Sequence, residues 1–209
     1  MLISKQQDID ELAWKKMDDL LPAIVQDAFD GRVLMQAFMN REALKQSLDT
    51  GRVTFWSRSR EVLWTKGETS GNTLDLITVH GDCDLDCLLV LAKPNGPTCH
   101  RDTDSCFDCD TATIPDLAFL ASLERLVSKR ATLLPQGSYT TELFKAGTKR
   151  IAQKVGEEGV ETALAATAGD NEELVNESAD LLFHLLVLLR SRNVGLADVV
   201  STLQSRHGS

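Results

Sequence analysis

Hydrophobic residues in the first half of the chain come in short runs rich in Val, Ile, Leu and aromatic residues, which is typical of β-strands. The runs at 23–29 and 33–39 flank Asp30-Gly31, a dipeptide that favours a tight hairpin turn. Further strand-like runs lie at 53–57, 62–65, 74–80 and 85–92. A short helix is predicted at 8–20, and a second begins after Asn40, a good N-cap, and stops at Gly51. The first part of the chain is therefore predicted to be α+β.

After about residue 110 the apolar residues recur at helical spacing instead. The expected helices cover 117–131, 147–168, 171–193 and 196–205. A turn at 134–138 precedes Thr140 and Thr141, either of which is expected to cap the next helix. The run 181–189 is apolar on nearly every side, which predicts a central position or an interface.

The composition also changes near residue 110, since all five Cys and all three Trp precede it. Residues 110–116 are interpreted as a linker, because Pro115 breaks regular structure. A chain of 209 residues allows one large or two small domains. We predict two, residues 1–113 and residues 114–209, the second an all-α helical bundle.

The formal net charge of −9 argues against non-specific binding to nucleic acid or to anionic membranes. A nucleotide ligand stays compatible with this charge, because bound divalent metals supply positive charge. No apolar run reaches the roughly 18 residues of a transmembrane helix. An odd number of cysteines without a recognisable signal peptide predicts a cytoplasmic protein in which metal binding is favoured over disulfides.

Two kinds of metal ligand alternate in the segment that begins at residue 82. If this segment is extended, Asp82, Asp84 and Asp86 share one face, and three carboxylates suit a hard cation such as Mg²⁺. Cys83 then lies on the opposite face and suits zinc, with Cys99 and Cys106 returning from a loop. Three readings stay open on spacing alone. They are a catalytic zinc with an open position, a closed structural site that adds Cys109, and thiols that bind no metal.

A second set of carboxylates lies on two consecutive helices. Spacings of three and four residues place members of each set on one helix face, and antiparallel packing would bring the two sets together. The residues are Glu157, Glu158 and Glu161 on one helix, and Glu177 and Asp180 on the next. Converging carboxylates repel one another unless cations intervene, which favours Mg²⁺, whereas the alternative is a solvated acidic stripe. His184, one turn further on, is interpreted as a packed or hydrogen-bonded residue rather than a ligand.

Several longer motifs carry a family resemblance that covers nearly the whole chain. They are Phe55-Trp56-Ser57-Arg58-Ser59-Arg60, the run from Leu63 to Asn72, the Asp-Cys-Asp-Leu-Asp run at 82–86, Cys99-His100, Ser105-Cys106-Phe107, and the E-E-x-x-E then E-x-x-D pattern of the helical part. The first part resembles phosphoribosyl-AMP cyclohydrolase, and the second is similar to phosphoribosyl-ATP pyrophosphohydrolase. Together they resemble the bifunctional enzyme of histidine biosynthesis.

This resemblance implies two hydrolases in one chain. The helical domain would convert phosphoribosyl-ATP to phosphoribosyl-AMP and pyrophosphate. The N-terminal domain, with a small, mostly antiparallel sheet, would then open the adenine ring between N1 and C6 to give the formimino-aminoimidazole carboxamide ribotide. Members of this family form homodimers. The resemblance therefore implies a zinc site shared between subunits, with Cys83 from one and the pair Cys99 and Cys106 from the other.

The resemblance implies further metal ligands, and the mechanism that it suggests adds candidates chosen by the position and chemistry of their side chains. Asp82, Asp84 and Asp86 would bind Mg²⁺ in the first domain, and Glu158, Glu161, Glu177 and Asp180 would bind it in the second. His100 is the candidate general acid or base of ring opening, and Glu157 is a metal ligand or base. Expected substrate contacts are Arg58, Arg60, Lys66, Glu68, Thr69, Ser70, Asn72 and Lys154, the last with an ordinary helix-surface charge as its alternative.

Two rival functions are compatible with parts of this pattern. One is a zinc deaminase fused to a nucleotide-pool pyrophosphatase, although the chain lacks the H-x-E and P-C-x-x-C signature of those deaminases. The other is a structural zinc module with a helical dimerisation arm, which leaves a carboxylate cluster on two helices unexplained.

Overall fold

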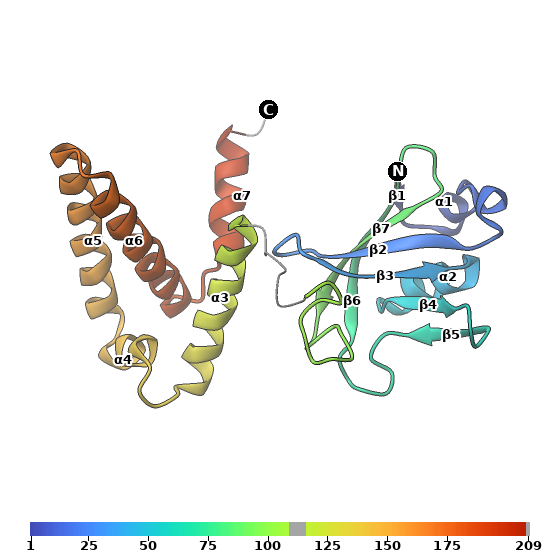
Figure 1. Cartoon of the computed structure of the whole chain (residues 1–209), viewed down its shortest axis with the longest axis horizontal. Helices are drawn as coiled ribbons and strands as arrows, with labels where there is room; N and C mark the ends of the chain where they lie inside the picture. The colour runs from blue at the N-terminus through green and yellow to red at the C-terminus, as the bar shows by residue number, and fades with distance from the viewer. Residues whose placement is uncertain (109–115, 208–209) are drawn as a thin grey trace. The chain divides into compact units, whose positions relative to one another are not determined.

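The computed structural model describes residues 1–108 and 116–207, which form two compact units, Met1–Ala118 and Phe119–Ser209. Figure 1 shows the strands in the first unit and only helices in the second. The expected fold class, an α+β unit followed by an all-α unit, is confirmed. The predicted border between residues 113 and 114 lies outside the described residues and stays a prediction. Within the described ranges, no helix combines the length and hydrophobicity needed to cross a lipid bilayer.

A five-stranded sheet organises the first unit. Its strands stand in the order β1-β6-β7-β2-β3, and every neighbouring pair is antiparallel except β2 and β7, which are parallel. The bounds are β1 Leu2–Ile3, β2 Leu21–Asp27, β3 Val33–Met39, β6 Leu74–Gly81 and β7 Leu88–Pro94. A separate antiparallel hairpin joins β4, Thr54–Ser57, to β5, Val62–Thr65. The predicted hairpin around Asp30-Gly31 is thus present as β2 and β3.

One face of the sheet carries the core of this unit. Val25 of β2 and Val90 of β7 are paired and fully buried, and they belong to the same apolar cluster as Leu44, Phe55 and Trp14. Leu44 lies on α2, Arg41–Thr50, whose first turn is capped by Asn40, with its Oδ1 accepting from the Ala43 N–H at 2.8 Å. Gly51 ends this helix in the left-handed conformation, as its sequence position predicts.

The opposite face of the sheet is left with apolar side chains in contact with solvent. Ile24 and Leu89 are directly paired across β2 and β7 and are each 37% exposed, and Ile77 of β6 is 54% exposed. Alternation along β2 and β7 puts Ile24 and Leu89 on the face away from the core, and Ile77 stands at the irregularity between Leu76 and Thr78 in the β6–β7 ladder.

The single helix predicted at 8–20 is wrong in extent. The chain instead forms a short α1, Gln6–Asp10, and a 3₁₀ turn η1, Trp14–Met17. Between them the indole N–H of Trp14 donates to the Ile9 carbonyl at 2.6 Å, and the backbone N–H of Ala13 donates to the Leu85 carbonyl at 2.8 Å. In a continuous helix the Ala13 N–H would donate to the Ile9 carbonyl. Here each of these two groups has a different partner.

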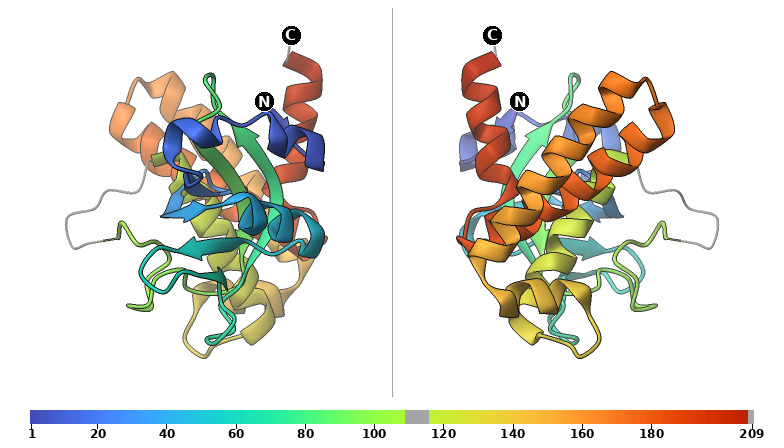
Figure 2. Two further views of the ribbon diagram at one scale, coloured as in Figure 1. Left: turned by 90° about the vertical axis from the view of Figure 1, so that its right-hand side faces the viewer. Right: turned by 90° about the vertical axis from the view of Figure 1, so that its left-hand side faces the viewer.

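The second unit contains two long helices that lie side by side, as Figures 1 and 2 both show. They are α5, Thr148–Ala168, and α6, Asn171–Ser191, accompanied by α3 Asp116–Leu133, α4 Tyr139–Ala146 and α7 Leu196–His207. The Asp170 carboxylate caps α6 by accepting from the N–H groups of Glu172 and Glu173 at 3.0 Å each. Thr140 and Thr141 are buried inside α4 rather than capping it, because the helix already begins at Tyr139.

Candidate functional site

A cavity of about 390 Å³ lies between the β5–β6 turn and the loop that follows β7. Many of the residues singled out from the sequence line it: Lys66, Thr69, Ser70, Asn72, Cys99, His100 and Cys106, with Trp64, Gly67 and Asp102 among their neighbours. The predicted contact Glu68 does not line this cavity. Its carboxylate instead accepts from the Thr65 N–H at 3.2 Å, which closes the turn.

Asn72 joins the two walls of this cavity. The Lys66 ammonium donates to the Asn72 carbonyl at 3.1 Å. Gly67, at φ +83°, lies so close that an added Cβ would stand 2.5 Å from the Asn72 backbone carbonyl. On the other wall, a Cβ on Gly96 would stand 2.5 Å from the Asn72 side-chain oxygen. Only glycine allows these approaches, so the two loops are held in close contact at one residue.

The cysteine loop is attached to the edge strand β3. The Cys106 N–H donates to the Leu34 carbonyl at 2.7 Å, and the Ser105 hydroxyl donates to the Val33 carbonyl at 2.8 Å. The nearly buried Arg32 forms an ion pair with Asp104 on the same loop at 3.4 Å. Together these bonds fix Cys106 within hydrogen-bonding reach of Cys99.

The electrostatics of the cavity favour a thiolate at Cys99. The backbone N–H of Arg101, aided by donors at Thr103 and Cys106, lowers the pKa of the Cys99 thiol. Burial raises the pKa of Cys106 and lowers the pKa of the neighbouring Lys66 ammonium. His100 Nδ1 lies 3.8 Å from Cys99 Sγ. A thiolate is the form in which cysteine binds metal, so the lowered pKa of Cys99 suits zinc, and Cys106 offers a second sulfur in the same cavity.

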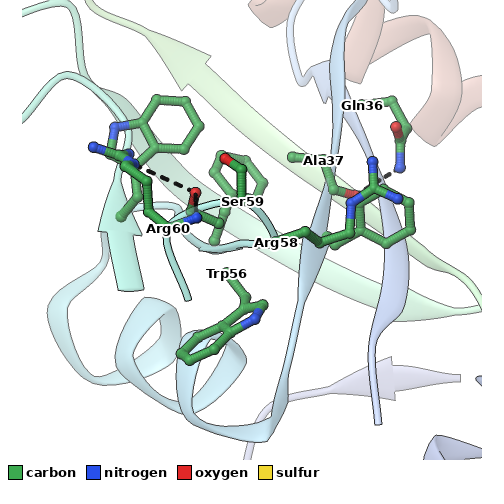
Figure 3. Close-up of a pocket in the computed structure, with 10 residues that line it drawn as sticks. Gln36, Ala37, Trp56, Arg58, Ser59 and Arg60 are labelled. Atoms are coloured by element: carbon green, nitrogen blue, oxygen red, sulfur yellow. Dashed lines mark hydrogen bonds between the residues drawn. The ribbon is translucent and has the colours of Figure 1, made fainter. Parts of the chain in front are cut away.

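Arg58 and Arg60 lie in a different cavity of about 380 Å³, formed by β3, β4 and the β4–β5 turn. Figure 3 shows the two arginines extending away from each other, with Arg58 directed toward Gln36. The Arg58 guanidinium stands 3.8 Å from the centroid of the Phe38 ring, and Arg60 Nε donates to the Ser57 hydroxyl at 3.4 Å. The predicted substrate contacts of the first unit are therefore divided between two cavities.

The acidic segment after β6 is not extended, so the predicted alternation of faces is wrong. β7 begins at Leu88 instead of residue 85, and residues 82–87 form the β6–β7 hairpin loop. Leu85 has φ +62°, and the Asp82 carboxylate accepts from the N–H of Asp86 at 3.0 Å. This bend brings ligand atoms of Asp82, Cys83 and Asp84 within 4.8 Å of one another.

Lys16 of η1 faces the same hairpin loop. Its ammonium forms ion pairs with Asp84, at 2.5 Å, and with Asp86. These pairs raise the pKa of Lys16 and lower the pKa of Asp84. No sequence signal identified this contact, because the two residues are 68 positions apart.

Cys83 and the Cys99–Cys106 pair lie at opposite ends of the sheet. Gly81 pairs with Leu88 at one end of the β6–β7 ladder, next to Cys83, and Leu74 pairs with Pro94 at the other end, next to the cysteine loop. The ladder between them is about 20 Å long, since the seven residues of β7 are separated by six steps of about 3.3 Å. One chain therefore does not bring the three predicted zinc ligands together, and Cys109, the ligand that a closed structural site adds, lies outside the described residues.

In the helical unit, Glu158, Glu161 and Glu177 offer oxygens within 4.8 Å of one another. Glu158 is buried at 4% exposure, although Glu161 is exposed. Partial burial, followed by the charges of Glu161 and Glu158, raises the pKa of Glu177. These three carboxylates form the predicted cluster between α5 and α6 and fit a hard cation.

Glu157 and Asp180 were also predicted as ligands. In the part of the chain that the structure describes, neither belongs to the group formed by Glu158, Glu161 and Glu177. Glu157 instead pairs with Lys154 at 2.9 Å and with Arg150 at 3.2 Å. Lys154 also forms an ion pair with Glu158 at 2.5 Å, which raises the Lys154 pKa and lowers that of Glu158. Lys154 thus borders the carboxylate cluster.

His184 supports the cluster from α6. Its Nδ1 bonds to the Asp180 carbonyl at 2.8 Å, so Nε2 is the acceptor for the Tyr139 hydroxyl at 3.0 Å when the imidazole is neutral. Nδ1 also lies 3.7 Å from Glu158. His184 is buried and hydrogen-bonded, as predicted. Tyr139 was not identified from the sequence, because its role depends on the packing of α4 against α6.

Comparison with known proteins agrees with both units. The family model "Phosphoribosyl-AMP cyclohydrolase" matches residues 35–108, and "Phosphoribosyl-ATP pyrophosphohydrolase" matches residues 120–207. The chain belongs to the family of bifunctional histidine-biosynthesis proteins. Among similar relatives is "Histidine biosynthesis bifunctional protein HisIE" of Photobacterium profundum, 55% identical over 93% of this chain and 95% of its own length.

Proteins with the same description in Escherichia coli K12 and Yersinia pestis are 55% and 52% identical to this chain. Both matches cover 97% of this chain and 98% of the relative. The cyclohydrolase model matches residues of the α+β unit, and the pyrophosphohydrolase model matches residues of the helical unit.

Proposed function

We propose that the helical unit hydrolyses phosphoribosyl-ATP and that the first unit then opens the purine ring of phosphoribosyl-AMP. The family assignment supports a bifunctional hydrolase of histidine biosynthesis. The observation that carries the site assignment is the convergence of Lys66, Cys99, His100 and Cys106 on one cavity. A separate carboxylate cluster between α5 and α6 supports a second, independent reaction centre.

For ring opening, the residues of the first cavity would bind and orient the purine and move protons. Cys99 and Cys106 would hold zinc, which supplies an acidified water near neutral pH. His100, which is exposed and lines the cavity, would take a proton from that water or give one to N1 as the N1–C6 bond breaks. The Thr69 and Ser70 hydroxyls and the Lys66 ammonium would hold polar groups of the substrate. Asp82 and Asp84 would hold Mg²⁺ in the hairpin loop, with Asp86 beside them.

We further propose that the active form is a homodimer in which Cys83 of one copy joins Cys99 and Cys106 of another. The separation of these thiols along the β6–β7 ladder supports this arrangement, because a third sulfur from the same chain stands at the wrong end. Apolar side chains on the open sheet face, Ile24, Leu89 and Ile77, also favour a covered interface. The unpaired thiols that this site needs favour a cytoplasmic location.

For pyrophosphate release, Glu158, Glu161 and Glu177 would hold Mg²⁺, with Asp180 one turn after Glu177. Such a cation would supply positive charge for the phosphates and a site for water at the bond between the α and β phosphates. Lys154, at the edge of the cluster, would exchange its carboxylate partners for a phosphate oxygen. Glu157, held by Lys154 and Arg150, stays the candidate base.

Replacing Glu161 by Gln tests the assignment of the helical unit. We expect loss of pyrophosphate release from phosphoribosyl-ATP with ring opening of supplied phosphoribosyl-AMP retained. Glu172→Gln is the matched control, because Glu172 is exposed in the first turn of α6 and lies outside the cluster. Retained pyrophosphate release in Glu161→Gln would remove Glu161 from the site.

Mixing two inactive variants tests the shared zinc site. Cys83→Ser and Cys106→Ser should each lack ring opening and bound zinc. Unfolded together and refolded as a mixture, they should regain part of both, because a mixed dimer contains one site with all three thiols. If the mixture stays inactive although dimers form, the three thiols do not combine across subunits.

A further inference from the structure

The substrate assigned above to the first unit has two similar ends. Phosphoribosyl-AMP carries one ribose phosphate on N9 of its purine and a second on N1. C6, where ring opening occurs, is bonded to N1, and N9 lies on the far side of the fused rings. A site for this molecule must therefore accept two phosphates on opposite sides of one aromatic core. The inference below rests on the proposed ring-opening function.

The first unit offers two cavities of nearly equal size that share one residue. The cavity with Cys99 and His100 measures about 390 Å³, and the cavity with Arg58 and Arg60 measures about 380 Å³. Trp64 of β5 lines both of them. Its indole is partly exposed and packs at a tilt against the buried ring of Phe55, with ring centroids 5.6 Å apart. This contact restrains the indole on the side that faces the core. A purine that contacts this indole would lie next to both cavities.

The two cavities differ in chemistry. The first contains the thiols and a turn with hydroxyl and amide groups, Thr69, Ser70 and Asn72. The second contains two guanidinium groups and the hydroxyls of Ser57 and Ser59 (Figure 3). Within residues 1–108 and 116–207, neither Arg58 nor Arg60 forms an ion pair with a carboxylate. Both are exposed, so their charge is available to an anion that enters from solvent.

We propose that the purine lies against Trp64, that the N1 ribose phosphate occupies the cysteine cavity, and that the N9 phosphate enters the cavity lined by Arg58 and Arg60. The position of the thiols fixes this direction, because the N1 arm is the one adjacent to the reacting C6. Arginine suits the distant phosphate because its planar group donates two parallel hydrogen bonds. The arginine cavity thus acts as a binding subsite that holds the substrate by the end that does not react.

AMP isolates one half of this arrangement, because it carries the N9 arm and lacks the N1 arm. All three tryptophans belong to the first unit, so quenching of tryptophan fluorescence reports AMP binding there without interference from the helical unit. We expect Arg58→Gln/Arg60→Gln to weaken AMP binding by roughly tenfold or more, since one charge-assisted hydrogen bond contributes about that factor. Ser70→Ala should leave AMP binding unchanged and raise the KM for phosphoribosyl-AMP.

Arg52→Gln is the matched control, because Arg52 is exposed, precedes β4 and lines neither cavity. It should bind AMP like the unchanged protein. Equal AMP affinity in the double arginine variant would overturn the proposal, and a loss of AMP binding in Ser70→Ala instead would show the reverse orientation. If the unchanged zinc-loaded protein opens no purine ring, the proposed function itself fails, which is a separate outcome.

Discussion

Gly67 is the position at which a single added methyl group should damage the first cavity most. Replacing it by alanine introduces two separate costs. The left-handed conformation at φ +83° costs a residue with a Cβ roughly 1 kcal/mol. In addition, the new Cβ would stand 2.5 Å from the carbonyl carbon and oxygen of Asn72, where backbone rather than a flexible side chain must move. Overpacking of this kind typically costs about 1–3 kcal/mol, which gives roughly 2–4 kcal/mol in total.

Gly71 in the same turn separates these two costs. It has nearly the same conformation, φ +80°, but an added Cβ meets nothing within 4 Å. Gly71→Ala should therefore lose only the conformational part, roughly 1 kcal/mol. The difference between the two variants measures the collision with Asn72 alone.

Urea unfolding followed by tryptophan fluorescence is the appropriate assay, because all three tryptophans report on the first unit. Ring opening should fall further in Gly67→Ala than in Gly71→Ala, since displacement of Asn72 also moves the Lys66 ammonium that donates to its carbonyl. Equal free energies of unfolding in the two variants would refute the reasoning, because the close approach of Gly67 to Asn72 would then carry no energetic weight.

Three further variants test contacts in both units. Lys16→Met should lower the Tm of the first unit in EDTA and leave it nearly unchanged at saturating Mg²⁺, because Lys16 is the cation that offsets Asp84 and Asp86. Asn40→Ala should destabilise the same unit by about 1 kcal/mol in urea unfolding, since the Ala43 N–H loses its side-chain acceptor. Lys154→Met should lower the stability of the helical unit, measured by far-UV circular dichroism, by about 1 kcal/mol, because Glu158 is buried beside it.

Each of these three predictions has a control variant or an outcome that would contradict it. Lys15→Met should have the same Tm as the unchanged protein in EDTA. If the Tm of Lys16→Met stays low at saturating Mg²⁺, then Mg²⁺ does not replace the Lys16 ammonium beside the aspartates. An Asn40→Ala protein as stable as the original would mean that water replaces the cap. Lys149→Met is the control for Lys154, since Lys149 is exposed at the start of α5, and equal losses in both would point to general charge effects.

The sequence alone determined the features whose causes are local. Asn40 and Gly51 bound a helix by hydrogen bonds and backbone conformation within a few residues, and the structure has that helix at Arg41–Thr50. Spacing of three residues placed Glu158 and Glu161 on one face of α5, because helix geometry needs no other part of the chain. The motifs that carry the family resemblance are also read directly from the order of residues.

Tertiary structure decided the features whose causes are distant in the chain. Alternation of Asp82, Cys83 and Asp84 between two faces requires an extended backbone, and the hairpin loop instead bends them onto one side. Cys106 reaches Cys99 because its loop is bonded to β3, about 70 residues earlier, as the Ser105 contacts also show. The separation of Cys83 from both follows from the length of a paired ladder. Such contacts depend on which strands become neighbours, and local sequence patterns do not specify that.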